Sequence, residues 1–342
     1  MDPQSFTRLA NNFYNSKGLE SHIDRISLDA ELINYYSNNQ KIGDNKFKVA
    51  FVFICLNPLY WQYAPEMVNG AKRFFLPGHQ TEFFFWTDIP ESGVKEKISE
   101  AWKEKGQNIE DPNILQTLTN VSNSVTDLRG KSDITLFPTE SVQWPYPTLL
   151  RYSLFLQQEE KLKEYDFIFY CDIDMQFMNI VGDEILGEGL TAALHPMYAL
   201  RKEYWPPYEP NPDSASYIKR PGRLTDDNGR PRFMPLYFAG GFQGGKSDKF
   251  IEAMKATKGI IEKDLNKNYI PIWNDETAWN KYLSENAPET VLTPAYVYPD
   301  SLIEQYYEPL WGCKYQPKLK TLTKWFTTSK EGGDAVAKMI NK

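Results

Sequence analysis

The stretch that decides the expected fold is Asp166-Phe167-Ile168-Phe169-Tyr170-Cys171-Asp172-Ile173-Asp174-Met175. Its first part is a continuous run of aromatic and β-branched side chains, which predicts a strand buried on both faces of a parallel sheet. The strand ends abruptly in the carboxylates of Asp172 and Asp174. In open α/β sheets, ligands bind at the carboxyl ends of the strands. The stretch therefore predicts an α/β sheet with a ligand site at the end of this strand.

The pair Asp172 and Asp174 indicates a bound cation. Two carboxylates this close repel each other unless a cation lies near them. Mn²⁺ or Mg²⁺ prefers oxygen ligands, and a diphosphate can complete its coordination. A polar turn after the strand explains the same two residues, because Asp favours turns. The pattern by itself leaves both interpretations open.

Alternating apolar and polar segments extend this fold along the chain. The alternation predicts a mostly parallel, doubly wound α/β sheet flanked by helices. The polar, charged stretch of about 91–125 shows little periodicity beyond a possible helix and is expected to form a surface loop or insertion. Thr148 is expected to cap a helix that runs to Lys163. The further strands are expected at residues 47–55, 82–87, 133–137 and 190–196, and the further helices at 67–75, 246–261 and from 274 onward.

Composition and charge exclude several classes of protein. The length of 342 residues suits one large α/β domain or two smaller ones. A net charge of −7 argues against binding to a nucleic-acid backbone. The three cysteines, Cys55, Cys171 and Cys313, form neither a disulfide framework nor a zinc motif, which indicates a reducing compartment.

The ends and the hydropathy of the chain give an expectation about its location. The start, Met1-Asp2-Pro3-Gln4-Ser5, is polar and lacks the apolar segment of a signal peptide. No stretch approaches the roughly 18 consecutive apolar residues of a membrane span. We therefore expect a soluble, cytoplasmic protein without a membrane anchor.

A glycine-rich segment follows at residues 237–245, Tyr-Phe-Ala-Gly-Gly-Phe-Gln-Gly-Gly. Its glycines permit a close approach of the backbone to a neighbour or a ligand. The segment lacks the Lys-Ser/Thr continuation of a phosphate-binding P-loop. A strand that lines a ligand pocket and a plain hairpin explain the pattern equally well.

A second carboxylate cluster, Trp273-Asn274-Asp275-Glu276-Thr277, precedes an amphipathic helix. Asn274 or Asp275 can cap the helix, and its dipole favours Glu276 in the first turn. Glu276 can instead face a pocket as an anionic nucleophile or base. A carboxylate beside an anomeric carbon stabilises or traps an oxocarbenium ion during retaining glycosyl chemistry.

Taken together, these segments resemble glycosyltransferase family 6, which contains the histo-blood-group A and B transferases and the α1,3-galactosyltransferases. The likeness spans roughly residues 48–300. The segments that carry it, in chain order, are Tyr170-Cys171-Asp172-Ile173-Asp174-Met175-Gln176-Phe177, Val181-Gly182-Asp183-Glu184-Ile185-Leu186, Leu194-His195-Pro196, Gly240-Gly241-Phe242-Gln243-Gly244-Gly245, Trp273-Asn274-Asp275-Glu276, Asn280-Lys281-Tyr282-Leu283 and Val291-Leu292-Thr293-Pro294.

The resemblance implies a GT-A fold and a hexosyltransferase activity. Such an enzyme transfers galactose or N-acetylgalactosamine from a UDP-sugar to a glycan acceptor, in α1,3 linkage with retention, using Mn²⁺ or else Mg²⁺. The implied domain covers residues 46–325, with a nucleotide-binding half at 46–175 and an acceptor and catalytic half at 176–325. It lies between an N-terminal extension at 1–45 and a C-terminal tail at 326–342.

The resemblance also assigns the donor site. Asp172 and Asp174, with Ile173 between them, would hold Mn²⁺ on the UDP diphosphate. Asp275 would bind hydroxyl groups of the donor sugar. Arg151 matches a donor-binding arginine, although an exposed helix arginine would look the same. The small residues Ala239 and Gly241, on either side of Gly240, would face the C2 substituent of the donor and leave room for an N-acetyl group. The uridine end of the first strand would hold Cys55, Leu56, Asn57 and Tyr60. The Tyr60 ring would stack on uracil or belong to the core.

The catalytic and acceptor residues follow from the same resemblance. Glu276 would be the nucleophile or the ion-pair stabiliser. Trp273 would line the acceptor site together with His195, although a lone histidine is more often structural.

The chain departs from the family pattern in several ways. Asn274 stands where the family has a histidine, and we expect the protein to lack the vertebrate-type membrane anchor. With the Asp-x-Asp motif retained, this indicates a microbial or viral source. Lys318, Lys320 and Lys324 are alternative candidates for a basic segment that closes over the diphosphate. A donor such as UDP-glucose, or a glycan- or nucleotide-binding module without turnover, remain alternative functions.

Overall fold

The structure is a computed structural model that describes residues 47–197, 207–218, 237–300, 316–322 and 324. The expected extension at 1–45, the expected tail at 326–342 and Cys313 lie outside the described residues.

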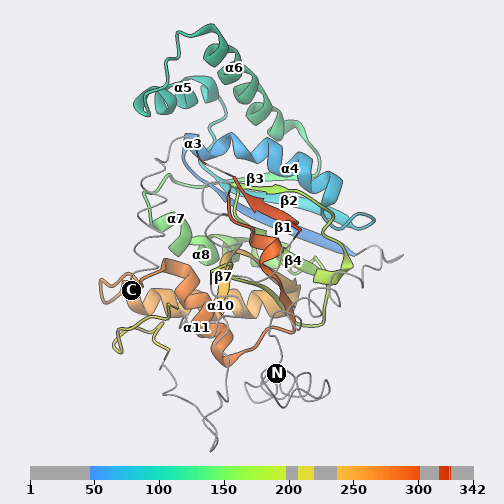
Figure 1. Cartoon of the computed structure of the whole chain (residues 1–342), viewed down its shortest axis with the longest axis vertical. Coiled ribbons are helices and arrows are strands. Elements are labelled where there is room, and N and C mark those ends of the chain that lie inside the picture. Colours follow the sequence, from blue (N-terminus) through green and yellow to red (C-terminus); the bar gives the residue numbers. More distant parts are fainter. Residues whose placement is uncertain (1–46, 198–206, 219–236, 301–315, 323, 325–342) are drawn as a thin grey trace, which may run out of the picture.

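A seven-stranded sheet, in the order β3-β2-β1-β4-β7-β6-β8, forms the centre of the molecule (Figure 1). Strands β3, β2, β1 and β4 run parallel, β7 is antiparallel to both of its neighbours, and β6 is parallel to β8. This confirms the predicted mostly parallel α/β sheet and agrees with a GT-A-like fold. The strands are β1 (Lys48–Cys55), β2 (Gln80–Thr87), β3 (Ile134–Pro138), β4 (Phe167–Cys171), β6 (Leu190–Leu194), β7 (Phe238–Lys246) and β8 (Thr290–Leu292).

The strand that was predicted to decide the fold lies in the middle of the sheet. All five residues of β4 are buried, and β4 pairs with β1 on one side and with β7 on the other. Helices cover both faces, so a continuous apolar run is what this position requires. The carboxyl end of β4 therefore opens at the centre of the sheet edge, directly before Asp172.

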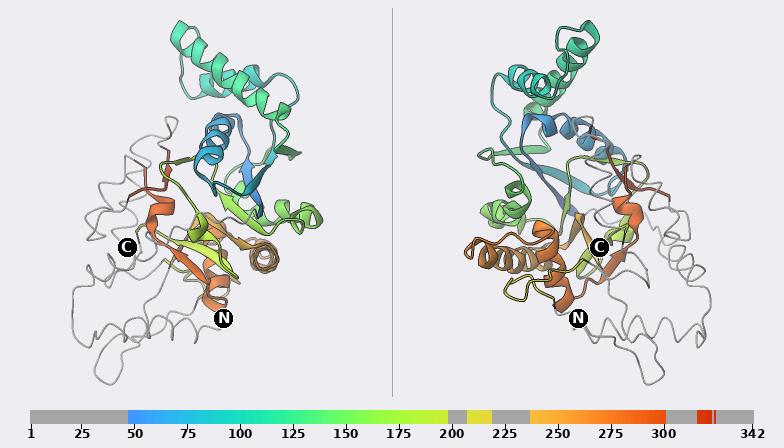
Figure 2. Two further views of the ribbon diagram at one scale, coloured as in Figure 1. Left: turned by 90° about the vertical axis from the view of Figure 1, so that its right-hand side faces the viewer. Right: turned by 60° about the vertical axis from the view of Figure 1, so that its left-hand side comes forward.

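Helices pack on the two faces of the sheet (Figures 1 and 2). One face carries α3 (Pro58–Trp61) and α4 (Tyr63–Phe74), with α5 (Val94–Glu104) and α6 (Pro112–Thr126) beyond them. The other face carries α7 (Tyr146–Leu149), α8 (Arg151–Phe155), α9 (Glu159–Leu162), α10 (Ser247–Leu265) and α11 (Asn274–Glu285). No helix in the described part of the chain is both long and apolar enough to span a membrane.

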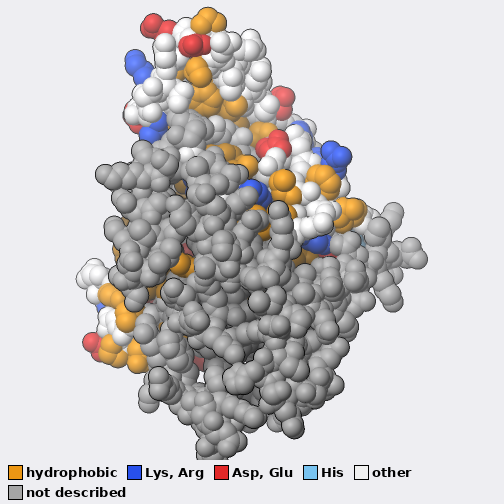
Figure 3. Space-filling model, in the orientation of Figure 1, with side chains coloured by type: hydrophobic (Ala, Val, Ile, Leu, Met, Phe, Trp, Pro, Cys, Tyr) orange, Lys and Arg blue, Asp and Glu red, His pale blue; other side chains and the backbone are white. Residues whose placement is uncertain are grey.

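Two expectations about the helices were wrong. The stretch at 91–125 is not a loop, because it forms α5 and α6, whose buried side chains pack on each other and on α4. Asp111 caps α6, with Pro112 in its first turn. The α5–α6 lobe carries intermixed acidic and basic side chains (Figure 3). The charged residues of α5 and the uncharged polar residues of α6 hid the apolar stripes of these helices.

The predicted helix over 148–163 is divided into α7, α8 and α9 with a 3-10 turn between the last two. Thr148 is not its N-cap, since its hydroxyl donates to the carbonyl of Pro145 at 2.8 Å. The buried side chains of Arg151, Tyr152 and Phe155 fix the middle of the segment, and packing overrides the local helical pattern.

The glycine-rich segment forms β7, and packing requires two of its glycines. A Cβ on Gly244 would lie 2.4 Å from the Ile168 carbonyl oxygen. Gly245 has a φ of +138°, and a Cβ there would lie 2.3 Å from the Gly189 oxygen. These glycines bring β7 against β4 and β6. The first pair, Gly240 and Gly241, lies at the other end of the strand.

Candidate functional site

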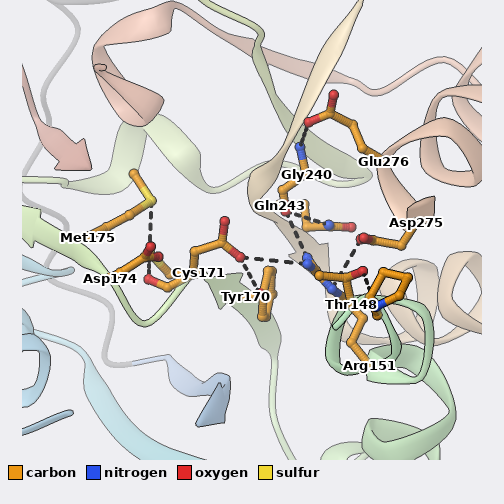
Figure 4. Close-up of polar contacts among 12 residues, drawn as sticks. Thr148, Arg151, Tyr170, Cys171, Asp174, Met175, Gly240, Gln243, Asp275 and Glu276 are labelled. Carbon is orange, nitrogen blue, oxygen red and sulfur yellow. Dashed lines mark hydrogen bonds and ion pairs between the residues drawn. The ribbon is translucent and has the colours of Figure 1, made fainter. Parts of the chain in front are cut away.

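Four elements meet at the carboxyl end of β4 (Figure 4). The loop after β4 supplies Asp172 and Asp174, β7 supplies Gly240, α8 supplies Arg151, and the first turn of α11 supplies Asp275 and Glu276. The structure therefore brings together the two carboxylate clusters that lie about 100 residues apart in the sequence.

Arg151 lies at the centre of this group and is buried. Its Nη1 donates to the Gly240 carbonyl at 3.0 Å. Its Nε lies 3.1 Å from Asp275 Oδ2, in an ion pair without the alignment of a hydrogen bond, and Nη2 lies 3.7 Å from Asp172 Oδ1. The guanidinium stacks over the Tyr170 ring at 4.2 Å. An exposed helix arginine is therefore the wrong interpretation of this residue.

Asp172 and Asp174 lie in different surroundings. Asp172 is partly exposed and accepts a hydrogen bond from the Tyr170 hydroxyl, while its own N–H donates to the Gly241 carbonyl at 2.9 Å. Asp174 is buried, which raises its pKa, and the nearby Lys324 opposes that rise. Lys324 Nζ lies 2.5 Å from Asp174 Oδ2. Asp174 therefore holds a positive group in this structure.

The C-terminal segment reaches this site through a short sheet. Strand β9 (Leu319–Thr321) pairs with β5 (Met175–Phe177), which directly follows Asp174. Of the three candidate lysines, Lys318 pairs with Glu184 and Lys320 lies over the Tyr298 ring. Lys324 is the one of the three that meets the Asp-x-Asp motif.

Neither Asn274 nor Asp275 is the N-cap of α11, whereas Glu276 lies in its first turn as expected. The N-cap position is Trp273, and Asn274 begins the helix with a φ of +53°. Asp275 is buried against Arg151, and burial raises its pKa to about 6. Both carboxylates are thus turned toward the centre of the site (Figure 4).

Glu276 accepts a hydrogen bond from the Gly240 N–H at 2.7 Å. Burial raises the pKa of its carboxyl to about 7, and the hydrogen bond from the Gly240 N–H, together with the nearby Tyr237 hydroxyl, opposes a further rise of this pKa. A partly buried carboxylate whose pKa is raised this far is typical of a residue with a chemical role.

The predicted uridine residues divide into two groups. Cys55 and Leu56 are buried in the cores on opposite faces of the sheet, and Asn57 accepts from the Leu59 N–H at 3.0 Å as the N-cap of α3. Tyr60 is only partly buried, and Lys324 Nζ lies 5.4 Å from its ring centroid. Tyr60 thus lies beside the Asp174–Lys324 pair, whereas the other three side chains support the turn that presents it.

His195 and Trp273 lie on the Glu276 side of the site. His195 Nδ1 accepts from the Met197 N–H at 3.1 Å, and its ring meets Tyr237 edge-on at 5.7 Å. Burial lowers the pKa of His195 to about 4, which keeps the ring neutral. Trp273 is partly buried, and its backbone N–H donates to the Thr277 hydroxyl at 3.1 Å.

The residues around the first glycine pair have different neighbours. A Cβ on Gly240 would lie 3.4 Å from Glu276 Cβ, whereas a Cβ on Gly241 would lie 2.9 Å from Asp172 Oδ2. Ala239 is buried. Gly241 therefore faces the first aspartate of the motif directly.

The sequence did not point to Tyr152, Tyr237 and Gln243. Tyr237 contacts Glu276 and His195, and Gln243 contacts Gly240. One signal was present for Gln243, because it is a polar side chain between two glycine pairs within an otherwise buried strand. For the two tyrosines no local signal separates them from core residues.

Comparison with known proteins identifies the class. Residues 149–316 match the model of glycosyltransferase family 6. The chain is 29% identical over 245 residues to histo-blood group ABO system transferase 1 of Rattus norvegicus, covering 71% of this chain and 59% of that protein. The rat transferase 2 is 33% identical over 245 residues, covering 71% and 61%. Human globoside alpha-1,3-N-acetylgalactosaminyltransferase 1 is 24% identical over 243 residues, covering 70% and 58%.

This chain belongs to glycosyltransferase family 6. It spans about three fifths of the length of these relatives, which are 58–61% covered.

The expected cytoplasmic location and microbial or viral source were wrong. The relatives that overturn this expectation are animal transferases, from rat and human. The expectation rested on a missing anchor, and a chain that covers only part of its relatives gives no support for such a conclusion.

Proposed function

We propose that this chain is a retaining hexosyltransferase that moves galactose or N-acetylgalactosamine from a UDP-sugar to a glycan acceptor in α1,3 linkage. One observation carries the proposal, namely that the Asp172/Asp174 pair and the Asp275/Glu276 pair share one site around Arg151 and Gly240. The names of the relatives, which include an alpha-1,3-N-acetylgalactosaminyltransferase, support the sugar and the linkage.

Asp172 and Asp174 are suited to hold Mn²⁺, or else Mg²⁺, with the donor diphosphate. The partly exposed Asp172 and the buried Asp174 offer two carboxylates, and among the described residues no third His, Cys, Asp or Glu joins them. The ammonium group on Asp174 supports the fit, because the site already holds positive charge there. When bound, the metal ion would offset the negative charge of the diphosphate leaving group.

The donor is oriented by residues on both sides of the aspartates. The Tyr60 ring offers a face for uracil beside Lys324, whose ammonium suits a diphosphate. Asp275, fixed by Arg151, would accept hydrogen bonds from hydroxyl groups of the donor sugar. These contacts hold the anomeric carbon near Glu276.

Glu276 is the proposed catalytic carboxylate. Its negative charge would stabilise, or attack, the oxocarbenium-like centre that forms as UDP departs. The acceptor would lie on the side of His195 and Trp273. A neutral His195 can hydrogen-bond to a sugar hydroxyl, and without a positive charge it does not form an ion pair with the Glu276 carboxylate.

The test is UDP release from UDP-galactose, UDP-N-acetylgalactosamine and UDP-glucose, with and without Mn²⁺ and with a panel of glycan acceptors. We expect acceptor-dependent release with one of the first two donors in the presence of Mn²⁺. Release from UDP-glucose alone would replace the proposed donor. If the protein binds UDP but releases UDP from none of the donors, the proposed enzyme function is wrong and the chain is a binding module.

A further inference from the structure

We propose that Gln243 is a positioning residue that holds Gly240 in place and thereby aims the Gly240 N–H at the catalytic carboxylate of Glu276. This role rests on the proposed function of Glu276. It adds a residue to the site that does not touch the reacting atoms.

Gly240 lies where the sheet leaves its backbone without regular pairing. The ladder between β7 and β4 ends at Phe242, and the register between β7 and β6 is irregular between the pairs at Gln243 and Phe238. Side chains contact Gly240 instead. Its N–H donates to Glu276, and its carbonyl accepts from Arg151 and Gln243. Because glycine can adopt a wide range of backbone torsion angles, these three hydrogen bonds set the orientation of the Gly240 N–H and carbonyl.

Gln243 is fully buried and both ends of its amide are engaged. Its Oε1 accepts from the Tyr152 hydroxyl at 2.9 Å. Its Nε2 donates to the Gly240 carbonyl at 3.0 Å (Figure 4). Tyr152 is itself buried. Tyr152 therefore fixes which end of the amide faces Gly240, since a hydroxyl donor selects the carbonyl oxygen.

A buried amide needs a reason, because an apolar side chain would fill this place without the cost of removing a polar group from water. Arg151 alone does not secure the carbonyl of Gly240, because its guanidinium is shared among Gly240, Asp275 and Asp172. If the bound sugar donor draws the guanidinium of Arg151 away, the Gly240 carbonyl loses this hydrogen bond. Gln243, tied to Tyr152, keeps the second bond in place.

The consequence is a specific effect on turnover. Without the Gln243 bond, rotation about Gly240 turns its N–H away from Glu276, and the carboxylate loses alignment with the anomeric carbon. A small misplacement at a reacting centre lowers the rate by up to about 10²-fold. Donor binding at Asp172, Asp174 and Tyr60 is unaffected, so KM for the donor stays nearly constant.

The experiment compares Gln243→Met, Tyr152→Phe, the double variant and Thr191→Val. Methionine has a similar shape and cannot donate to Gly240. Thr191 is the matched control, because it is equally buried on the neighbouring strand and donates to a backbone carbonyl, that of Ile185, at 2.8 Å. For each variant, kcat, donor KM and the melting temperature are measured.

We expect Gln243→Met to lower kcat about 10- to 100-fold with donor KM within about 2-fold. The double variant should regain melting temperature, since both polar partners are then apolar, but not kcat. Thr191→Val should lose melting temperature and keep kcat.

A double variant that recovers kcat with stability would overturn the role of Gln243, and so would a normal kcat in Gln243→Met. A wild-type protein that releases UDP from no donor would instead overturn the proposed function, and this role with it.

Discussion

At the scale of single residues, Glu276 is the group on which the proposed chemistry depends. Glu276→Gln keeps the shape of the side chain and its contact with Gly240 but removes the charge that would stabilise the anomeric centre. We expect kcat to fall on the order of 10²-fold or more while UDP binding persists. The measurement is turnover together with UDP affinity by calorimetry. Near-normal turnover would return Glu276 to a structural role in the first turn of α11.

The pH dependence follows from the raised pKa of Glu276, about 7 against an ordinary value of 4.5. The charged form is needed, so kcat should rise with pH through about 7, and Glu276→Gln should remove this limb. The contribution of Glu276 to the stability of the fold changes with pH in the opposite direction to kcat. A carboxyl with a raised folded pKa stabilises the fold below pH 4.5, and this contribution is lost as pH rises through about 7. A kcat that falls across this range would contradict the assignment.

Gly241 gives a residue-scale prediction about the donor site. A Cβ there would lie 2.9 Å from Asp172 Oδ2, so Gly241→Ala must first displace the aspartate. We expect kcat/KM to fall for both UDP-galactose and UDP-N-acetylgalactosamine. We also expect a rise in the Mn²⁺ concentration that gives half-maximal activity. Gly259→Ala in α10 is the control, because in the described part of the chain no atom beyond its chain neighbours and its own helix backbone lies within 4 Å of the added Cβ. A change confined to the ratio of the two donors would show that the new methyl meets the sugar instead.

At the scale of elements, the buried Lys318–Glu184 ion pair fixes β9 and so the lysine at position 324. Lys318 Nζ lies 2.6 Å from Glu184 Oε1, and the Tyr296 hydroxyl donates to the same oxygen at 2.8 Å. Lys318→Met leaves a buried carboxylate without its cation. We expect a loss of about 3 kcal/mol of unfolding free energy, together with weaker UDP binding. Denaturant unfolding measures the first quantity and calorimetry the second.

The control for this prediction is Lys320→Met on the same strand. Its ammonium lies over the Tyr298 ring at 5.6 Å, and its side chain is less buried. It should change stability by less than Lys318→Met. Equal losses from both variants would mean that the ion pair is not what holds β9.

Elements also differ in how far the sequence predicted them. The strands β1, β2, β3, β4 and β6 were predicted within a few residues, because a buried strand is a short, continuous apolar run. The helices α5 and α6 were not located, since the few buried positions of α5 lie among charged residues and those of α6 lie among uncharged polar residues. The break of the segment at 148–163 depends on the burial of Arg151, a contact that local pattern does not contain.

At the scale of the whole molecule, a donor that bridges the two carboxylate clusters should stabilise the fold. A ligand that binds only the folded state adds about 2.7 kcal/mol at one hundred times its Kd. We expect UDP with Mn²⁺ to raise the melting temperature more than UDP alone, and chelation or Asp174→Asn to remove both this gain and the transfer activity. Full activity in EDTA would exclude the metal.

The sequence by itself determined the central strand, the position of Asp172 and Asp174 at its end and the order of the segments that mark the family. These features are local, because burial and strand length are written in consecutive side chains. Only the tertiary structure decided that Arg151 is buried against Asp275, that Glu276 faces Gly240 and that Lys324 rather than Lys318 or Lys320 meets Asp174. Arg151 and Gly240 are 89 positions apart, and the partner of a buried charge at such a separation depends on how the elements pack.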